Sequence, residues 1–314
     1  MAGGIAPDSR FALRFAARLR ERVMRTVGPP KRISDTRPSS MPQTIAKTAK
    51  GPIEYRFEGS GPTIVVLNGG HCSRATRLSH EKLTEHGFSV LTPSRPGYDS
   101  TPSEVGKSAQ AGADALVTLL DTLQISSVDV IGISAAGPTA LAFVEKYPIR
   151  VRKLILESAV ATDWDEQTKR RSRIGFGGAA KVTWAVMHIM LKLFPTVIIK
   201  ALMHDLTVLD VNRVIKRMSQ DDLAFVKRML QTSQASTGFL NDIEHKVDNL
   251  ATITKPVLVM YSPNDGTVSP KNAQRLASEI ATCELYEVPS DTHLIWIGKS
   301  ANDVWQKRLS FLRP

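Results

Sequence analysis

The chain has 314 residues and 42% hydrophobic content, enough to bury the core of a large α/β domain, which excludes disorder of the whole chain. No apolar run reaches the roughly 18 residues of a membrane-spanning helix, and the N-terminus lacks the apolar segment of a secretory signal, so we expect a cytoplasmic protein. The net charge of +11 is concentrated in residues 1–50, which carry +8 and leave +3 for the remainder, so we expect no nucleic-acid partner.

The basic N-terminus predicts an amphipathic helix followed by a linker. Apolar side chains recur every four residues along residues 11–23, while arginines occupy the other side. The apolar stripe consists of Phe11, Phe15, Leu19 and Val23. Such a helix can dock on its own domain, contact a membrane surface peripherally or direct the chain to an organelle, and the pattern leaves these alternatives open. Four prolines in residues 28–42 predict a linker, which places the first domain boundary at residue 42.

From residue 43 onward, short apolar runs with many β-branched residues predict strands. These runs are residues 63–68, 88–93, 128–133, 151–158 and 255–262. Helical patterns separate most of them, and this alternation predicts an α/β fold with a mostly parallel central sheet flanked by helices. In open sheets of this type the functional groups gather at the carboxyl ends of the strands.

The alternation stops between Ser158 and Lys255, where the chain reads as helices. Residues 182–203 are unusually apolar, which predicts an apolar pocket, and Pro195 should break their helix. The side chains assigned to this pocket are Trp184, Met187, Met190, Phe194 and Met203. The predicted parts of the chain after the linker are a first core segment (43–157), an inserted helical cap (158–255) and a second core segment (256–314).

Residues 130–143, VIGISAAGPTALAF, place Ser134 between a strand and a helix. A serine on such a sharp turn has a strained backbone and tolerates only small neighbours, and Gly132 and Ala136 flank it at the required spacing. We expect the helix to begin at Ala135. Its free N–H groups and positive dipole end would face the hydroxyl, which favours Ser134 as a nucleophile.

With this turn, the sequence resembles the α/β-hydrolase fold family over roughly residues 50–312. The stretch LNGGH, residues 67–71, is similar to the turn that completes the family's oxyanion hole, with Asn68 where histidine is common. The resemblance implies that the N–H groups of Gly70 and Ala135 form that hole.

The stretch PSRPGYDST, residues 93–101, resembles the family's R-P-G-x-G-x-S segment, with Asp99 in place of a glycine. The resemblance implies a turn that braces the site without reacting. It also implies that the inserted helices form a cap over the site.

The resemblance further implies a catalytic triad in the chain order Ser, Asp, His. The stretch YSPNDGTV, residues 261–268, matches the context of the family's acid and makes Asp265 the candidate, and His293 follows 28 residues later as the base. The expected geometry has Asp265 fixing the tautomer of His293, and His293 taking the proton of Ser134.

Other titratable side chains compete for these roles. Glu157, at the end of a predicted strand, and Asp291 are alternative acids, and the motif context favours Asp265 over both. The histidines expected to be solvated, because they lie in polar helical patterns, are His80, His86 and His245. Since no histidine pair has ligand spacing and no glycine-rich nucleotide motif occurs, we expect no metal and no cofactor. Cys72 and Cys283 predict two reduced thiols.

These residues favour a serine hydrolase that acts on a small apolar ester or related carbonyl compound through an acyl-enzyme. Hydrolysis of a carbon–carbon bond or of an amide would use the same three side chains on the same fold, so both stay open. A further alternative is a non-catalytic ligand-binding or interaction protein on this fold, which would not require a triad.

Overall fold

The structure, a computed structural model, describes residues 44–177, 180–234 and 237–313. The amphipathic helix and the linker predicted within residues 1–42 lie outside the described residues. Within the described ranges, no helix is long and apolar enough to cross a membrane. The two cysteines, both inside these ranges, are free thiols.

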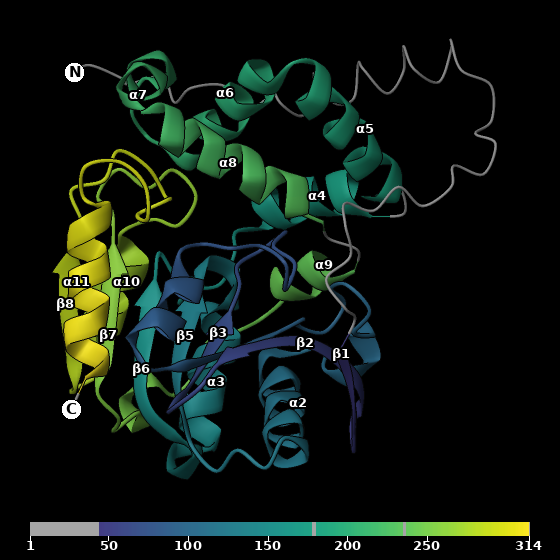
Figure 1. The fold of residues 1–314 in the computed structure, drawn as a ribbon, viewed down its shortest axis with the longest axis vertical. Coiled ribbons are helices and arrows are strands. Elements are labelled where there is room, and N and C mark those ends of the chain that lie inside the picture. The colour runs from purple at the N-terminus through teal and green to yellow at the C-terminus, as the bar shows by residue number, and fades with distance from the viewer. Residues whose placement is uncertain (1–43, 178–179, 235–236, 314) are drawn as a thin grey trace. The chain divides into compact units, whose positions relative to one another are not determined.

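Within these ranges eight strands form one sheet in the order β1-β2-β4-β3-β5-β6-β7-β8 (Figure 1). The strands are Thr44–Thr48 (β1), Gly51–Gly59 (β2), Thr63–Leu67 (β3), Ser89–Pro93 (β4), Val128–Ile133 (β5), Val151–Glu157 (β6), Val257–Tyr261 (β7) and Cys283–Glu287 (β8). The β1–β2 and β2–β4 pairs are antiparallel and the other pairs are parallel, which confirms the predicted sheet. The β1–β2 hairpin was not predicted, because its residues alternate between exposed and buried without forming an apolar run.

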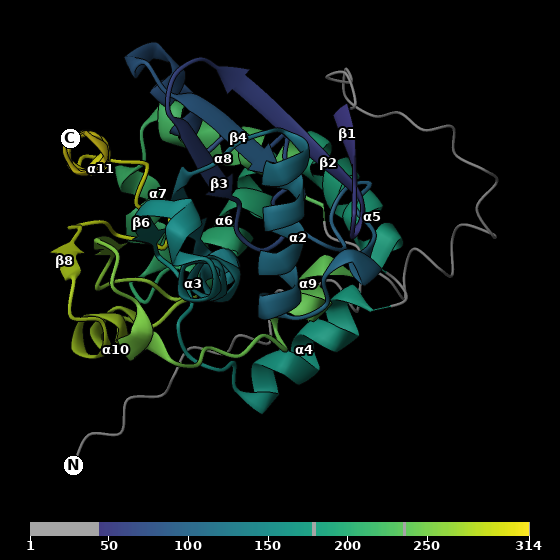
Figure 2. The same cartoon turned by 90° about the horizontal axis from the view of Figure 1, so that it is seen from below.

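The strands β3, β4 and β5 are buried on both faces, and their successive side chains point to opposite sides of the sheet. In β3, Val65 and Leu67 face one core while Ile64 and Val66 face the other. The helices that pack on the first face are α2 (Ala109–Thr122), α3 (Gly137–Lys146) and α10 (Lys271–Glu279). The helices on the second face are the 3-10 helix η1 (His80–His86) and α11 (Ala301–Leu312) (Figure 2).

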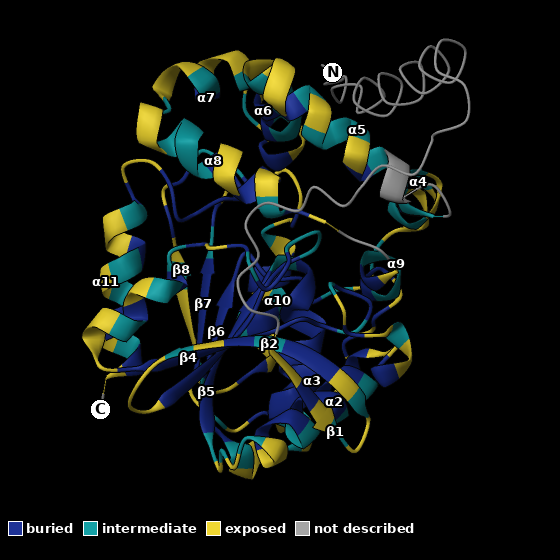
Figure 3. Cartoon of the chain, turned by 45° about the vertical axis from the view of Figure 1, so that its right-hand side comes forward, coloured by how far each residue is buried: buried dark blue, intermediate teal, exposed yellow. Residues whose placement is uncertain are grey.

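A helical insertion follows β6, as predicted. Its helices are α4 (Glu166–Phe176), α5 (Ala180–Leu193), α6 (Pro195–Leu206), α7 (Val211–Arg217), α8 (Gln220–Thr232) and α9 (Gly238–Asp242). Pro195 is the first residue of α6, so the predicted break falls where a proline lacks only an N–H that would be free in any case. Figure 3 shows exposed residues along the outer sides of α5 to α8 and buried residues where the helices meet. The domain boundaries at residues 42, 157 and 255 stay predictions.

The insertion lies over the carboxyl ends of the strands (Figure 1). The backbone N–H of His293 donates to the carbonyl of Leu206 at the end of α6, at 2.8 Å. The N–H of Gln234, beyond α8, donates to the carbonyl of His71 at 2.8 Å. These bonds fix the insertion to the loops in which the sequence predicts the functional residues.

Candidate functional site

Ser134 follows β5 on a tight turn with a left-handed backbone, φ 50°. A side chain at Gly132 would place its Cβ 2.6 Å from the Cβ of Ala140, and one at Gly137 would lie 2.2 Å from the carbonyl oxygen of Val160. The turn therefore needs small residues for steric reasons, as the sequence pattern indicates. The first turn, Ser134–Ala136, is a 3-10 helix and α3 begins at Gly137, so the expected start at Ala135 is wrong by two residues.

The glycines after β3 lie directly against this turn. A Cβ added at Gly69 would be 3.0 Å from the Cβ of Ser134, and one added at Gly70 would be 3.4 Å from the Cβ of Ala135. Asn68, which stands where the family often has histidine, donates its side-chain amide to the carbonyls of Ser73 at 2.9 Å and Thr76 at 3.2 Å. The asparagine therefore braces this loop through its own hydrogen bonds.

Asp265 and His293 come together at the ends of β7 and β8. His293 Nδ1 lies 2.6 Å from Asp265 Oδ2, and both side chains are buried. The other oxygen, Oδ1, accepts the backbone N–H groups of Thr267 and Val268, each at 2.8 Å. Three hydrogen bonds thus fix the carboxylate, and its contact with Nδ1 leaves Nε2 as the ring atom available to other groups.

Ser134 and His293 are linked through the segment that follows β6. Ser158 donates its hydroxyl to the carbonyl of His293 at 2.9 Å, and the N–H of Val160 donates to the carbonyl of Ser134 at 3.0 Å. Among the described residues, no hydrogen bond joins the Ser134 hydroxyl to the His293 ring. Such bonds are often long before a substrate binds, so the arrangement is compatible with proton transfer. Ser134 itself is half-buried.

Comparison with known proteins decides the family. A family model described as "Serine aminopeptidase, S33" matches residues 62–299. The chain is 34% identical over 270 residues to the uncharacterized hydrolase YcgS of Bacillus subtilis, an alignment that covers 83% of this chain and 95% of that protein. The chain belongs to this serine hydrolase family of the α/β-hydrolase fold.

Two solved structures show the same fold as this α/β-hydrolase. An α/β-hydrolase fold protein from Nakamurella multipartita aligns with a TM-score of 0.75 and 23% identity over 86% of this chain and 98% of its own. A thermophilic esterase from Thermogutta terrifontis aligns with a TM-score of 0.66 and 21% identity over the same shares. At these identities the likeness concerns the fold.

The two alternative acids of this hydrolase have other partners. Glu157 is fully buried and accepts hydrogen bonds from Trp296, from Arg308 at 2.8 Å and from His80 at 2.8 Å. Burial alone would raise the pKa of Glu157, but Arg308 and His80 outweigh it and hold that pKa well below its usual range. Asp291 is partly exposed and pairs with Arg217 at 3.1 Å.

Two of the three histidines predicted to be solvated are buried. His80 is 3% exposed and bonds to Glu157. Burial lowers the pKa of His80, and the charge of Arg308 lowers it further. His245 is 7% exposed, and its ring nitrogen lies 3.2 Å from the carbonyl of Lys107. The prediction failed because the partners of both rings lie on distant segments, so their polar local sequence gave no sign of burial. His86 is exposed, as predicted.

Aromatic rings from the insertion close around His71, which follows Gly70 in the loop after β3. The His71 ring lies 3.9 Å from Phe239, 4.4 Å from Phe176 and 5.4 Å from Trp184, measured between ring centroids. Burial lowers the pKa of His71 to about 4, so the ring is neutral at physiological pH. Phe194, assigned to the pocket from the sequence, is 52% exposed and lies between α5 and α6, so it does not belong to a buried pocket.

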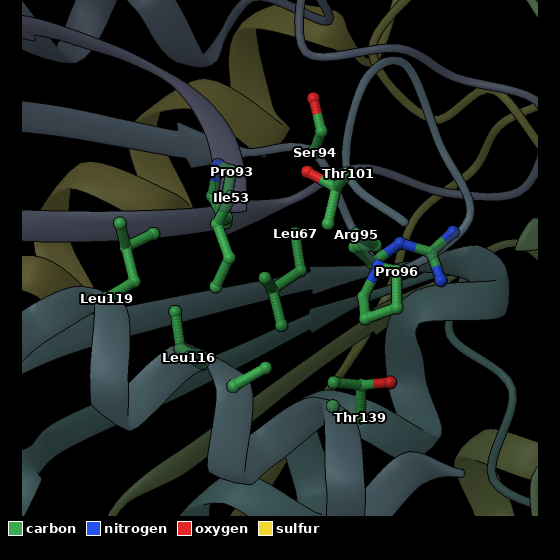
Figure 4. A pocket seen from close by; sticks show the side chains of 12 residues that line it. Ile53, Leu67, Pro93, Ser94, Arg95, Pro96, Thr101, Leu116, Leu119 and Thr139 are labelled. Atoms are coloured by element: carbon green, nitrogen blue, oxygen red, sulfur yellow. The ribbon is translucent and has the colours of Figure 1, made fainter. Parts of the chain in front are cut away.

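A separate cavity of about 20 Å³ lies between the sheet and α2 (Figure 4). Its walls are mostly apolar, with Leu67, Leu116 and Leu119 among them. The volume suits about one water molecule, which is too small for a substrate. In the described part of the chain, no group of three or more histidine, cysteine or acidic side chains is arranged to hold a metal ion.

Proposed function

We propose that this hydrolase cleaves small, uncharged, apolar esters through an acyl-enzyme, with Ser134 as nucleophile, His293 as base and Asp265 as the acid that orients it. The observation that carries the proposal is the 2.6 Å contact between Asp265 and His293, made at strand ends next to the strained Ser134 turn. A carboxylate at Nδ1 keeps the proton on that nitrogen, so Nε2 is free to accept one.

The reaction follows from these assignments. Ser134 Oγ attacks the carbonyl carbon while His293 Nε2 takes the hydroxyl proton. The N–H groups of Gly70 and Ala135 hold the oxygen that becomes negative. His293 then gives its proton to the leaving alcohol. Water, deprotonated by His293, attacks the acyl carbon and releases the acid with Ser134 restored.

The aromatic cluster around His71 supports an uncharged substrate. It borders the proposed oxyanion donor, because a Cβ added at Gly70 would lie 2.8 Å from the Phe239 ring. The His71 ring is neutral, and the rings of Phe176, Trp184 and Phe239 offer no counter-charge to an anionic acyl group. p-Nitrophenyl butyrate should therefore be cleaved with a higher kcat/KM than p-nitrophenyl hemisuccinate, which has a similar length and carries a carboxylate. Equal kcat/KM values would contradict the assignment of substrate class.

Labelling by a fluorophosphonate probe tests the nucleophile. The wild-type chain should be labelled, and Ser134→Ala should lose labelling and at least about 10³-fold of its ester turnover. Ser310→Ala, which removes an exposed hydroxyl on α11, is the matched control and should behave as wild type. A wild-type chain that is neither labelled nor active would favour the ligand-binding alternative, and faster turnover of an anilide or a 1,5-diketone than of the ester would favour amide or carbon–carbon hydrolysis.

We also propose that residues 1–42 bring the hydrolase to anionic membrane surfaces through the arginine face of their predicted helix. Each charge near such a surface contributes about 1 kcal/mol, and salt screens the attraction. The full-length chain should co-sediment with phosphatidylserine vesicles at low salt and less at high salt, whereas a chain without residues 1–42 should stay in solution and keep its esterase activity. Equal sedimentation of both chains would contradict the proposal.

A further inference from the structure

Arg95, in the turn that follows β4, reaches the backbone of residues 68–70, which we call the oxyanion turn because it carries the proposed donor Gly70. Its Nε donates to the carbonyl of Asn68 at 2.8 Å, and its Nη2 donates to the carbonyl of Gly69 at 3.1 Å. Its Nη1 pairs with Asp242, the last residue of α9 in the helical insertion. Figure 4 shows the guanidinium of Arg95 extending away from the small cavity that its stem helps to line.

The carbonyl of Gly69 belongs to the same peptide unit as the N–H of Gly70. A trans peptide is planar, so its C=O and N–H point in opposite directions. A donor that holds the Gly69 oxygen on one side therefore directs the Gly70 N–H to the other side. This peptide packs against the Ser134 turn, because a Cβ added at Gly69 would lie 3.0 Å from the Cβ of Ser134. Because Gly69 and Gly70 lack side chains, few steric barriers oppose rotation of this peptide. Besides the bond from Arg95, the Gly69 carbonyl accepts a longer hydrogen bond from the N–H of Cys72, at 3.3 Å.

Asp242 and Tyr98 keep the guanidinium in place. Arg95 is 5% exposed and Asp242 is 2% exposed, and the Tyr98 hydroxyl donates to the second carboxylate oxygen at 2.5 Å. Burial alone would lower the pKa of Arg95, but the charge of Asp242 outweighs burial and raises it, so Arg95 stays charged.

Helix α9 packs closely on the turn that carries Arg95. The N–H of Gly238 donates to the carbonyl of Gly97 at 3.0 Å, and a Cβ at Gly238 would lie 2.3 Å from the Tyr98 ring. The position of Asp242 relative to Arg95 is therefore set by tight backbone contact, and it does not depend on the ion pair alone.

We infer that Arg95 is a positioning residue that orients the Gly69–Gly70 peptide so that the Gly70 N–H faces the reacting carbonyl, and that Asp242 holds Arg95 in this role. The inference rests on the proposed function. It makes helix α9 of the insertion part of the support of the oxyanion hole. Without Arg95 the peptide can rotate, and the site loses one of its two donors to the developing negative charge.

The test compares Arg95→Met, Asp242→Asn and the double variant in the full-length chain. For Arg95→Met, kcat should fall about 10²-fold, the usual effect of losing one oxyanion-hole donor, with KM within about threefold of wild type. The affinity for a trifluoromethyl ketone, which forms a tetrahedral adduct with the serine, should fall by the same factor as kcat. Asp242→Asn should also lower kcat. The kcat of the double variant should be no lower than that of Arg95→Met, because both substitutions remove the same support of the Gly69–Gly70 peptide.

The matched control is Arg74→Met. Arg74 is also a buried arginine in an ion pair, 2.6 Å from Glu54, and its side chain does not bond to the oxyanion turn. Its loss should lower Tm and leave kcat within about twofold, since only a structural pair is broken. If Arg74→Met lowered kcat as much as Arg95→Met, the role of Arg95 would be structural and the inference would be wrong.

A crystal structure of Arg95→Met gives the direct readout. The Gly69–Gly70 peptide should be rotated or present in two orientations, and an unchanged peptide would overturn the inference whatever the activity. If Arg95→Met does not fold, Arg95→Lys replaces it under the same criteria, because one ammonium group cannot reproduce the fork that serves Asn68, Gly69 and Asp242 together. A wild-type chain that reacts with no fluorophosphonate would refute the proposed function, and the peptide orientation would still decide this inference.

Discussion

Replacing Asp265 by asparagine keeps the shape of the side chain and changes what it presents to His293. In Asp265, Oδ1 accepts the N–H groups of Thr267 and Val268, each at 2.8 Å. The amide oxygen of asparagine can take the place of Oδ1, so both of these bonds survive. The amide NH₂ then takes the position 2.6 Å from His293 Nδ1. An NH₂ group only donates, so Nδ1 must accept and the ring proton moves to Nε2.

A protonated Nε2 has no lone pair with which to take the proton of Ser134. We therefore expect Asp265→Asn to lower kcat by about 10²- to 10⁴-fold with p-nitrophenyl butyrate. The fold should be retained, because the two backbone bonds persist and the lost charge-assisted bond costs about 2 kcal/mol. Circular dichroism and a thermal melt check the fold, and steady-state kinetics at neutral pH give kcat.

Glu157→Gln is the matched comparison, since it neutralises the alternative acid. Its amide oxygen can still accept a bond from Arg308, but the buried guanidinium loses its counter-charge, which should cost about 3 kcal/mol of stability. The kcat of the folded variant should stay within about tenfold of wild type, because no hydrogen bond joins Glu157 to His293 in the described part of the chain. If Glu157→Gln lowered kcat more than Asp265→Asn, the acid would be Glu157 and the reasoning would be refuted.

Two further predictions concern stability. Burial lowers the pKa of His71 to about 4 from an ordinary 6.5, so the unfolded chain binds a proton at higher pH than the folded chain. The free energy of unfolding should therefore fall by up to about 3 kcal/mol as the pH drops from 6.5 to 4. His71→Asn, which suits the left-handed φ of 63°, should show a shallower fall in denaturant titrations, and identical slopes would contradict this cause. Gly137→Ala should lower stability by about 3 kcal/mol or more, because its Cβ would lie 2.2 Å from the carbonyl oxygen of Val160, and an unchanged Tm would show that the turn can move.

The sequence by itself determined the parts of this protein that depend on neighbouring residues. The apolar runs predicted five strands of the sheet, because strand formation reflects local side-chain pattern. The small residues around Ser134 predicted its strained turn, which has φ 50°. Pro195 predicted the break between α5 and α6, because proline restricts its own backbone and that of the residue before it. Resemblance to a family supplied Asp265 and His293 as candidates.

Only the tertiary structure decided which polar groups meet. Arg308 reaches Glu157 across 151 residues, and Arg95 reaches Asp242 across 147 residues. A buried charge must find its counter-charge wherever the fold brings one, so a polar residue in a polar stretch can be solvated or fully enclosed with the same local sequence. His80 was misjudged for this reason. The partners of Arg95 also come from distant segments. The sheet order places the ends of β3 and β4 side by side, and α9 of the insertion packs against the turn after β4.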